Sequence, residues 1–195
     1  MDYKIEGEYS PLLTVFLNKN ELLCAKDGCE GWHSSGICEI HTADNIFDAL
    51  KNRLSEDNLF QRKYTSSVNN AEITLLPDKT PCTIFPINAD GSYTLLLERT
   101  AFLASTGDAK LTPFISKTFG EKRFELCAVT GTGTVFAQFS GNVIKRTLSE
   151  DEFLFVRAEQ LAACEKSCKL EISENESGIM LKISGGDILL YTVKR

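Results

Sequence analysis

The residues best suited to chemistry lie near the start of the chain, where cysteines and histidines cluster between residues 24 and 41. They are Cys24, Cys29, His33, Cys38 and His41. Thiolate and imidazole groups are preferred ligands of zinc, and four that converge could close a tetrahedral site. However, the spacing matches no standard finger or ribbon, and in an extended chain Cys38 and His41 point to opposite faces. We therefore expect no metal ion here.

Nucleophilic catalysis would need a base beside a nucleophile. The only imidazoles are those of His33 and His41, and neither lies near a nucleophile-elbow pattern. The pair Cys164 and Cys168 does not have the Cys-x-x-Cys spacing of redox motifs. We expect no catalytic residue, no cofactor and a protein that is not an enzyme. A zinc- or thiol-dependent enzyme using the region from Cys24 to His41 is kept as an alternative.

Two glycine-containing stretches could be taken for phosphate loops. They are Gly131-Thr132-Gly133-Thr134 and Gly185-Gly186-Asp187. Neither continues into a Gly-Lys-Ser/Thr ending or a helix, so no helix N-terminus would hold a phosphate. Both stretches instead predict tight turns that need glycine at positive φ.

Trp32 stands between Gly31 and His33 in a polar stretch. An indole in such a place could stack on a base or another ligand. It could equally cover the end of a sandwich, which is the reading we favour because indoles are more often buried.

The composition indicates one globular domain over residues 1–195. Of these residues 43% are hydrophobic, and 21 Lys+Arg against 27 Asp+Glu give a net charge of −6. The acidic charge disfavours nucleic acid as a partner. No apolar run approaches the ~20 residues of a membrane span, and the start does not resemble a secretory signal. We expect a cytoplasmic protein whose seven cysteines are thiols.

Most of the chain alternates apolar and polar residues with the period of a strand, as in residues 134–139 and 142–146. Turn signals such as Ala89-Asp90-Gly91 separate these short runs. The pattern predicts an all-β sandwich. One stretch, residues 45–54, instead has the spacing of a short amphipathic helix lying on the sheet.

Three stretches of the chain resemble one another, which indicates three related units. In the third stretch, residues 157–166 have high helix propensity, but its likeness to the strand-rich second copy predicts strand. Ser149 to Glu152 would then form a hairpin turn with a solvated acidic tip. The stretches are residues 22–26 leading to 37–40, residues 96–105 leading to 110–112, and residues 155–164 leading to 169–172.

The string Glu-Arg-Thr-Ala-Phe-Leu-Ala-Ser at 98–105 and the string Gly-Thr-Gly-Thr-Val-Phe at 131–136 resemble those of a known family, as do residues 148–156, 161–165 and 58–60. The chain is similar to the altered-inheritance-of-mitochondria family, which consists mostly of bacterial proteins of unknown function with some mitochondrial members. The resemblance implies a β-sandwich of three repeated units, similar to the fold of the tryptophan RNA-binding attenuation protein. It brings no agreed catalytic residue and no agreed ligand.

For function, we therefore expect a non-enzymatic scaffold or binding module that works through self-association. Many-stranded open sandwiches have edges that must be paired or covered, and homo-oligomers are a common solution. RNA binding is an alternative suggested by the implied likeness to the attenuation protein, and the net charge of −6 speaks against it.

Overall fold

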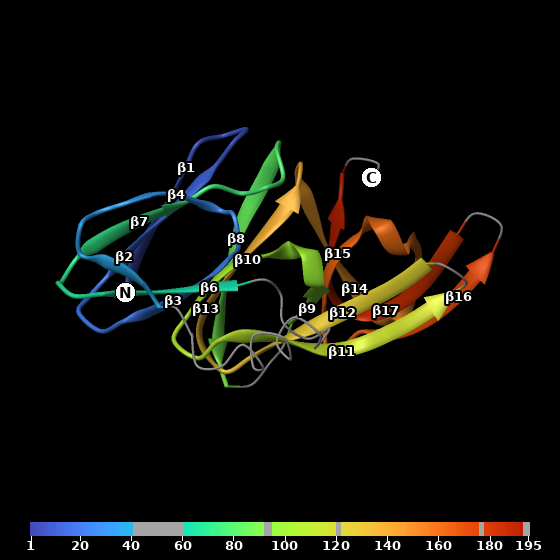
Figure 1. Ribbon diagram of the computed structural model, residues 1–195. Helices are drawn as coiled ribbons and strands as arrows, with labels where there is room; N and C mark the ends of the chain where they lie inside the picture. Colours follow the sequence, from blue (N-terminus) through green and yellow to red (C-terminus); the bar gives the residue numbers. More distant parts are fainter. Residues whose placement is uncertain (41–60, 92–94, 120–121, 176–177, 193–195) are drawn as a thin grey trace.

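The computed structural model describes residues 1–40, 61–91, 95–119, 122–175 and 178–192. These residues form antiparallel strands in three sheets (Figure 1). The helical turns among them are two short 3-10 segments, η1 (Arg99–Ala101) and η2 (Ala158–Gln160). The prediction of an all-β fold is therefore confirmed. The predicted helix at 45–54 lies outside the described residues.

The first two sheets contain strands β1 to β8 together with β10 and β13. The first sheet has the order β1-β2-β7-β4, and the second has the order β5-β6-β3-β10-β13-β8. In the first sheet the strands are β1 (Asp2–Glu6), β2 (Leu12–Leu17), β4 (Glu30–His33) and β7 (Ala71–Leu75). In the second they are β3 (Leu22–Lys26), β5 (Ile37–Ile40), β6 (Gln61–Ser66), β8 (Cys82–Asp90), β10 (Phe102–Thr106) and β13 (Thr132–Ser140).

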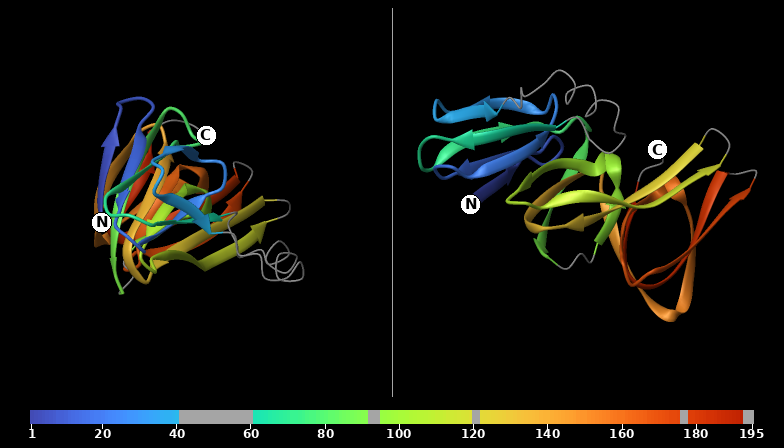
Figure 2. Two further views of the ribbon diagram at one scale, coloured as in Figure 1. Left: turned by 60° about the vertical axis from the view of Figure 1, so that its left-hand side comes forward. Right: turned by 60° about the horizontal axis from the view of Figure 1, so that its bottom comes forward.

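The third sheet curls into a half-barrel at the C-terminal end of the molecule, as the right-hand view of Figure 2 shows. Its order is β11-β12-β9-β15-β17-β14, and β16 also pairs with β17. The strands are β9 (Leu95–Glu98), β11 (Lys110–Phe119), β12 (Lys122–Thr130), β14 (Val143–Arg157), β15 (Leu161–Glu165), β16 (Lys169–Asn175) and β17 (Gly178–Tyr191).

The strand pairings repeat three times along the chain, which defines unit 1 (residues 12–75), unit 2 (82–140) and unit 3 (143–191). In unit 2, β13 pairs with β8 and β10, and β12 pairs with β9 and β11. Unit 1 repeats this with β7 between β2 and β4, and β6 between β3 and β5. In unit 3, β14 is one continuous strand that corresponds to β8 and β9 of unit 2, and β17 is one continuous strand that corresponds to β12 and β13. The strands β15 and β16 correspond to β10 and β11. The predicted three units are present, and they follow one another across Figure 1.

The units also share local irregularities. The same register shift occurs where β4, β10 and β15 pair with their neighbours, between Glu30 and Trp32, Phe102 and Ala104, and Leu161 and Ala163. A turn hydrogen bond follows each of these strands, from the N–H of Ile37, Ala109 or Cys168 to the carbonyl three residues earlier. The bulge and the turn therefore mark equivalent positions in the three units.

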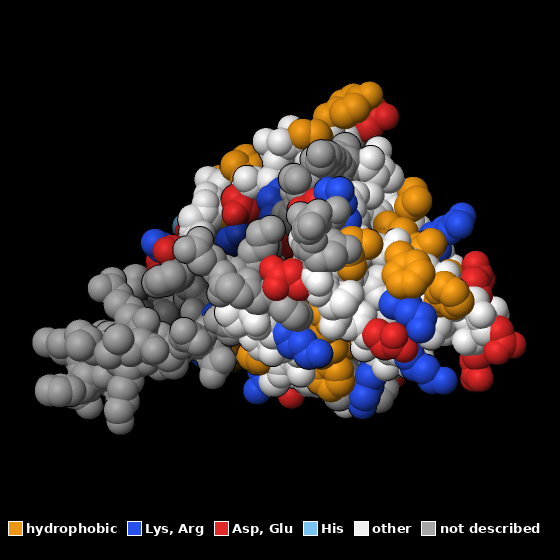
Figure 3. Space-filling view, turned by 90° about the vertical axis from the view of Figure 1, so that its right-hand side faces the viewer, with side chains coloured by type: hydrophobic (Ala, Val, Ile, Leu, Met, Phe, Trp, Pro, Cys, Tyr) orange, Lys and Arg blue, Asp and Glu red, His pale blue; other side chains and the backbone are white. Residues whose placement is uncertain are grey.

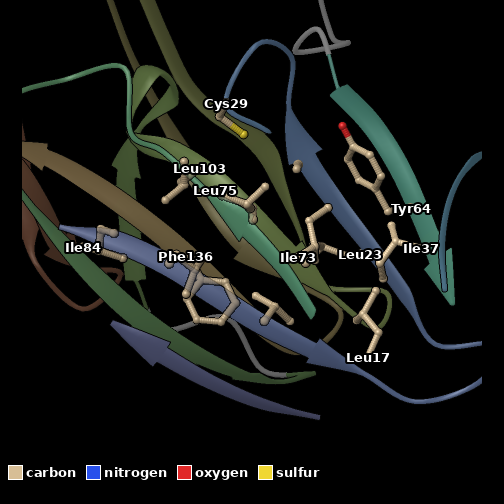
Figure 4. Packing of buried hydrophobic residues seen from close by; sticks show 14 of the residues in the cluster. Leu17, Leu23, Cys29, Ile37, Tyr64, Ile73, Leu75, Ile84, Leu103 and Phe136 are labelled. Carbon is tan, nitrogen blue, oxygen red and sulfur yellow. The ribbon is translucent and has the colours of Figure 1, made fainter. Parts of the chain in front are cut away.

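Three hydrophobic cores hold the sheets together. The first lies between the first and second sheets, where Leu17, Leu23 and Ile73 of unit 1 meet Leu103 and Phe136 of unit 2 (Figure 4). The second core lies between the second and third sheets, and the third fills the curl of the third sheet. Because the second sheet has a core on each face, β13 is buried from Val135 through Phe139.

Two local predictions for unit 3 have different outcomes. The helix-prone stretch 157–166 folds as η2 and strand β15, because pairing with β17 and β9 outweighs its helix propensity. The predicted hairpin at Ser149–Glu152 is wrong. These four residues are a bulge inside the continuous strand β14, opposite Gly185, and their acidic side chains are exposed as expected.

Candidate functional site

The cysteines and histidines of the N-terminal cluster are placed on different strands and at different depths. Cys29 is buried in the first core, Cys24 is half-buried on β3, and Cys38 and His33 are exposed on β5 and β4. His41 lies outside the described residues. Nowhere in the described residues do three or more His, Cys, Asp or Glu side chains come together as metal ligands would. The structure therefore does not gather Cys24, Cys29, His33 and Cys38 into one site.

Cys24, Cys29 and His33 each have a hydrogen-bond partner within the protein instead. The Cys24 thiol donates to Gln61 Oε1 at 2.8 Å, and the Cys29 thiol donates to the carbonyl of Lys26 at 2.8 Å. His33 Nδ1 lies 2.8 Å from the Ser34 carbonyl, and its Nε2 lies 3.4 Å from Glu30 Oε1. Burial raises the pKa of Cys29 to about 12, so this thiol stays protonated and is a poor ligand and nucleophile at neutral pH.

Thiol labelling will separate these cysteines. With iodoacetamide at pH 8, we expect Cys38 to react first, because it is exposed, and Cys29 to react only after unfolding. Peptide mass mapping against time measures the rates, and in denaturant all seven cysteines should be modified. Equal native rates for Cys29 and Cys38 would contradict the burial described here.

The second cysteine pair, Cys164 and Cys168, lies at the turn between β15 and β16. Both residues are buried in the third core, and their side chains are hydrogen-bond partners. This contact raises the pKa of Cys164 and lowers that of Cys168. The Cys168 thiol also lies 3.6 Å from the Asp187 carbonyl.

The glycines of both stretches have positive φ, as predicted, and Gly131 lies at the bend between β12 and β13. The predicted turn at Gly185-Gly186-Asp187 is wrong, because these residues lie inside the continuous strand β17. Gly131 has φ +82° and Gly133 has φ +134°, while Gly185 and Gly186 have φ +68° and +77°. The N–H of Thr132 donates to Asp108 Oδ1 at 2.8 Å, and the N–H of Thr134 donates to Thr106 Oγ1 at 2.9 Å. These amides are already used by the protein, so they are not available to cradle a phosphate.

The two joints between units are built alike and are buried. The N-terminal joint pairs β10 of unit 2 with β3 of unit 1, and the C-terminal joint pairs β15 of unit 3 with β9 of unit 2. β10 is buried at every residue, and β15 at every residue except its last, which is half-buried. Each strand has a neighbour on both sides, one from its own unit and one from the preceding unit.

At one end of the molecule, β4 takes the place in unit 1 that β10 and β15 take in units 2 and 3, but the described residues provide it with one neighbour, β7. Three of its four residues are exposed. Among them Trp32 is 51% exposed, so the prediction that it covers the end of the sandwich is wrong.

At the other end, residues 153–157 of β14 take the place of β3 and β9, and the described residues pair them with β17 alone. Phe155 is 63% exposed and packs edge-on against Phe153, with ring centroids 5.6 Å apart. Hydrophobic side chains gather beside charged ones on this end face (Figure 3). The residue of unit 2 that is equivalent to Phe155, Leu96, is buried in the third core.

The edges of β4 and of residues 153–157 of β14 are the candidate site, which is a candidate interface. The sequence alone did not reveal it. Trp32 was singled out as an aromatic residue in a polar stretch, but Phe153 and Phe155 have the alternation of an ordinary strand. The available signal was the repeat itself. Small residues at Ala104 and Ala163 correspond to Trp32, and Leu96 corresponds to Phe155, so aromatic residues stand where the inner units have smaller ones.

Comparisons with known proteins agree on the fold. The family model described as "Mitochondrial biogenesis AIM24" matches residues 3–194. The crystal structure of protein SPYM3_0169 from Streptococcus pyogenes, a structural genomics target, is similar with a TM-score of 0.79 and 16% sequence identity. That similarity covers 99% of this chain and 94% of the other. No curated protein matches the sequence. In the part of the chain that is described, no helix could span a membrane.

Proposed function

The chain belongs to the mitochondrial biogenesis AIM24 family, and from that premise we propose that it is a non-enzymatic scaffold or binding module that works through self-association. The observation that carries the proposal is the exposure of β4, whose equivalents β10 and β15 are buried between two neighbouring strands. A strand edge that lacks a neighbour offers N–H and C=O groups for pairing with another chain.

The side chains at the two ends support the same function. Trp32 at one end and Phe153 and Phe155 at the other are large, apolar and about half exposed or more. Aromatic residues are enriched at protein interfaces, where they add contact area with little loss of side-chain entropy. A protein whose exposed aromatic residues flank open strand edges at both ends is suited to assembly.

Native mass spectrometry of protein purified without chelator, combined with sedimentation velocity over a wide concentration range, tests this function. We expect assemblies heavier than the 21.6 kDa chain, with no stoichiometric metal. A monomer at every concentration would remove self-association, and one bound zinc per chain would favour the metal-enzyme alternative. Titration with mixed single-stranded RNA at low salt is expected to show no binding.

A further inference from the structure

The repeat specifies how two copies would meet. We propose that β4 of one copy pairs antiparallel with residues 153–157 of β14 in the next copy, so that copies join head to tail. This inference rests on the proposed self-association and adds the strands, their register and the symmetry class. Each chain makes this kind of joint twice internally, between β3 and β10 and between β9 and β15. Its two ends carry the two halves of a third joint.

The partner is a second copy of this chain, because its two exposed strand edges are equivalent to the two strands that pair at each internal joint. β4 is equivalent to the strands β10 and β15, which accept a preceding unit, and residues 153–157 are equivalent to β3 and β9, which accept a following unit. Unit 1 has no preceding unit and unit 3 has no following one in the described chain. Another copy supplies both missing neighbours, and the contact continues an interface the protein already uses.

The register of the new joint follows from the two existing ones. Ala104 lies opposite Ala25 in the first joint, and Ala163 lies opposite Leu97 in the second. Trp32 is the equivalent of Ala104 and Ala163, since all three directly follow the shared bulge.

The matching residue of β14 is Val156. Cys38, Lys110 and Lys169 are equivalent residues, and they pair with β6, β12 and β17. Ala25, Leu97 and Val156 pair with the same three strands, in each case three residues earlier along the strand, so these three residues are also equivalent. The residues they face are Arg62, Cys127 and Leu181, and the later ones are Thr65, Thr130 and Ser184.

In this register Trp32 lies opposite Val156, His33 opposite Phe155, and Ser34 opposite Leu154 of the neighbouring copy. Directly opposite residues of an antiparallel pair are on the same face and interact. Continuing by one residue places the exposed Arg157 opposite Gly31 and next to Glu30, so the charges are complementary. The joint would cover the Trp32 indole and the Phe155 ring, which are both exposed in the single chain.

Because the two edges differ, the contact is heterologous. A copy that uses its β14 edge still has its β4 edge open, so assembly continues until it closes as a ring or extends as a filament. A two-fold symmetric dimer would need the same surface on both copies. The head-to-tail contact therefore predicts that two differently blocked chains can complement each other.

Complementation of two blocked variants tests the contact. Trp32→Lys places a charge on the β4 edge, and Phe155→Lys places one on the β14 edge, and each variant alone is expected to be a monomer. Mixed, they should form a complex of one chain each, because Phe155→Lys keeps β4 and Trp32→Lys keeps β14. Trp32 is the only tryptophan of the chain, so in the mixture its emission should shift to the blue as the joint forms.

Ile144→Lys is the matched control, because Ile144 is an exposed apolar residue of the same strand outside residues 153–157. It should assemble like the wild type. If the wild type assembles and both blocked variants still assemble, or if their mixture gives no complex, this contact is wrong while the self-association stands. If the wild type is monomeric throughout, the proposed function itself fails.

Hydrogen exchange of the wild type checks the same contact without substitutions. Amides of residues 30–33 and 153–157 should become at least about tenfold more protected when dilute protein is concentrated above its assembly range, since paired edge amides exchange through opening. Amides of β8, the outer strand of unit 2, are the internal reference. Protection that rises equally in β8 and in residues 30–33, or not at all, would overturn the proposal.

Discussion

Replacing Phe136 by alanine is expected to lower the free energy of unfolding by about 3–5 kcal/mol, the range found when a buried phenylalanine is truncated. Phe136 is 1% exposed and lies in the first core (Figure 4). Its ring packs edge-on against that of Tyr3, with ring centroids 5.0 Å apart. Its removal leaves a cavity between the first and second sheets, where units 1 and 2 share their packing. Urea unfolding followed by circular dichroism measures the loss.

Phe85→Ala is the matched control for this substitution. Phe85 lies on the neighbouring strand β8 and is 38% exposed, so less apolar surface is lost and no closed cavity forms. We expect a loss of about 1 kcal/mol or less for an exposed position of this kind. Similar losses for Phe85→Ala and Phe136→Ala would show that the joint between units 1 and 2 is not packed as described.

The second large effect is expected at Gly131, where alanine should cost about 3 kcal/mol or more. A residue with a side chain at φ +82° is itself strained by about 1–2 kcal/mol. The added Cβ would also lie 2.3 Å from the carbonyl oxygen of Asp108, which is backbone and has no room to move without breaking the turn. Thermal and urea unfolding of Gly131→Ala measure the combined cost.

Gly28→Ala separates the two contributions. Gly28 has a similar φ of +79°, but a Cβ there would meet nothing within 4 Å. Its substitution should therefore cost only the conformational strain of about 1–2 kcal/mol. If Gly28→Ala and Gly131→Ala are equally destabilised, the close approach between the β12–β13 turn and Asp108 is not present in solution.

The repeat could be predicted from the sequence because its signal is local. Apolar pairs such as Leu96-Leu97 and Phe155-Val156, followed at fixed spacing by Lys110 and Lys169, mark strands that pair in the same way in units 2 and 3. The same comparison gave strand β15 in place of a helix. Recurrence of a pattern carries this information, whereas propensity of a single stretch does not.

The order of strands within the sheets could not be predicted in this way, and the candidate interface depends on it. Exposure of Phe155 follows from the absence of a described strand beside residues 153–157, and no property of β14 itself encodes which strand lies there. The cysteines show the same limit. In an uninterrupted strand Cys29 and His33 would share a face. The bulge between Glu30 and Trp32 changes this, so the Cys29 thiol is buried in the first core and the His33 imidazole is exposed.

The continuous strand β17 makes the C-terminal third of the chain dependent on its last stretch. Residues 178–191 are the shared hydrogen-bonding partner of β14, β15 and β16, whereas units 1 and 2 divide that task between two separate strands. A nonsense mutation shortly before Gly178 would remove the pairing strand of β14 and β16, leave β15 paired with β9 alone, and uncover the third core. A truncation in the loop after β13 would instead remove unit 3 as a whole and leave β9 as an edge strand of its sheet.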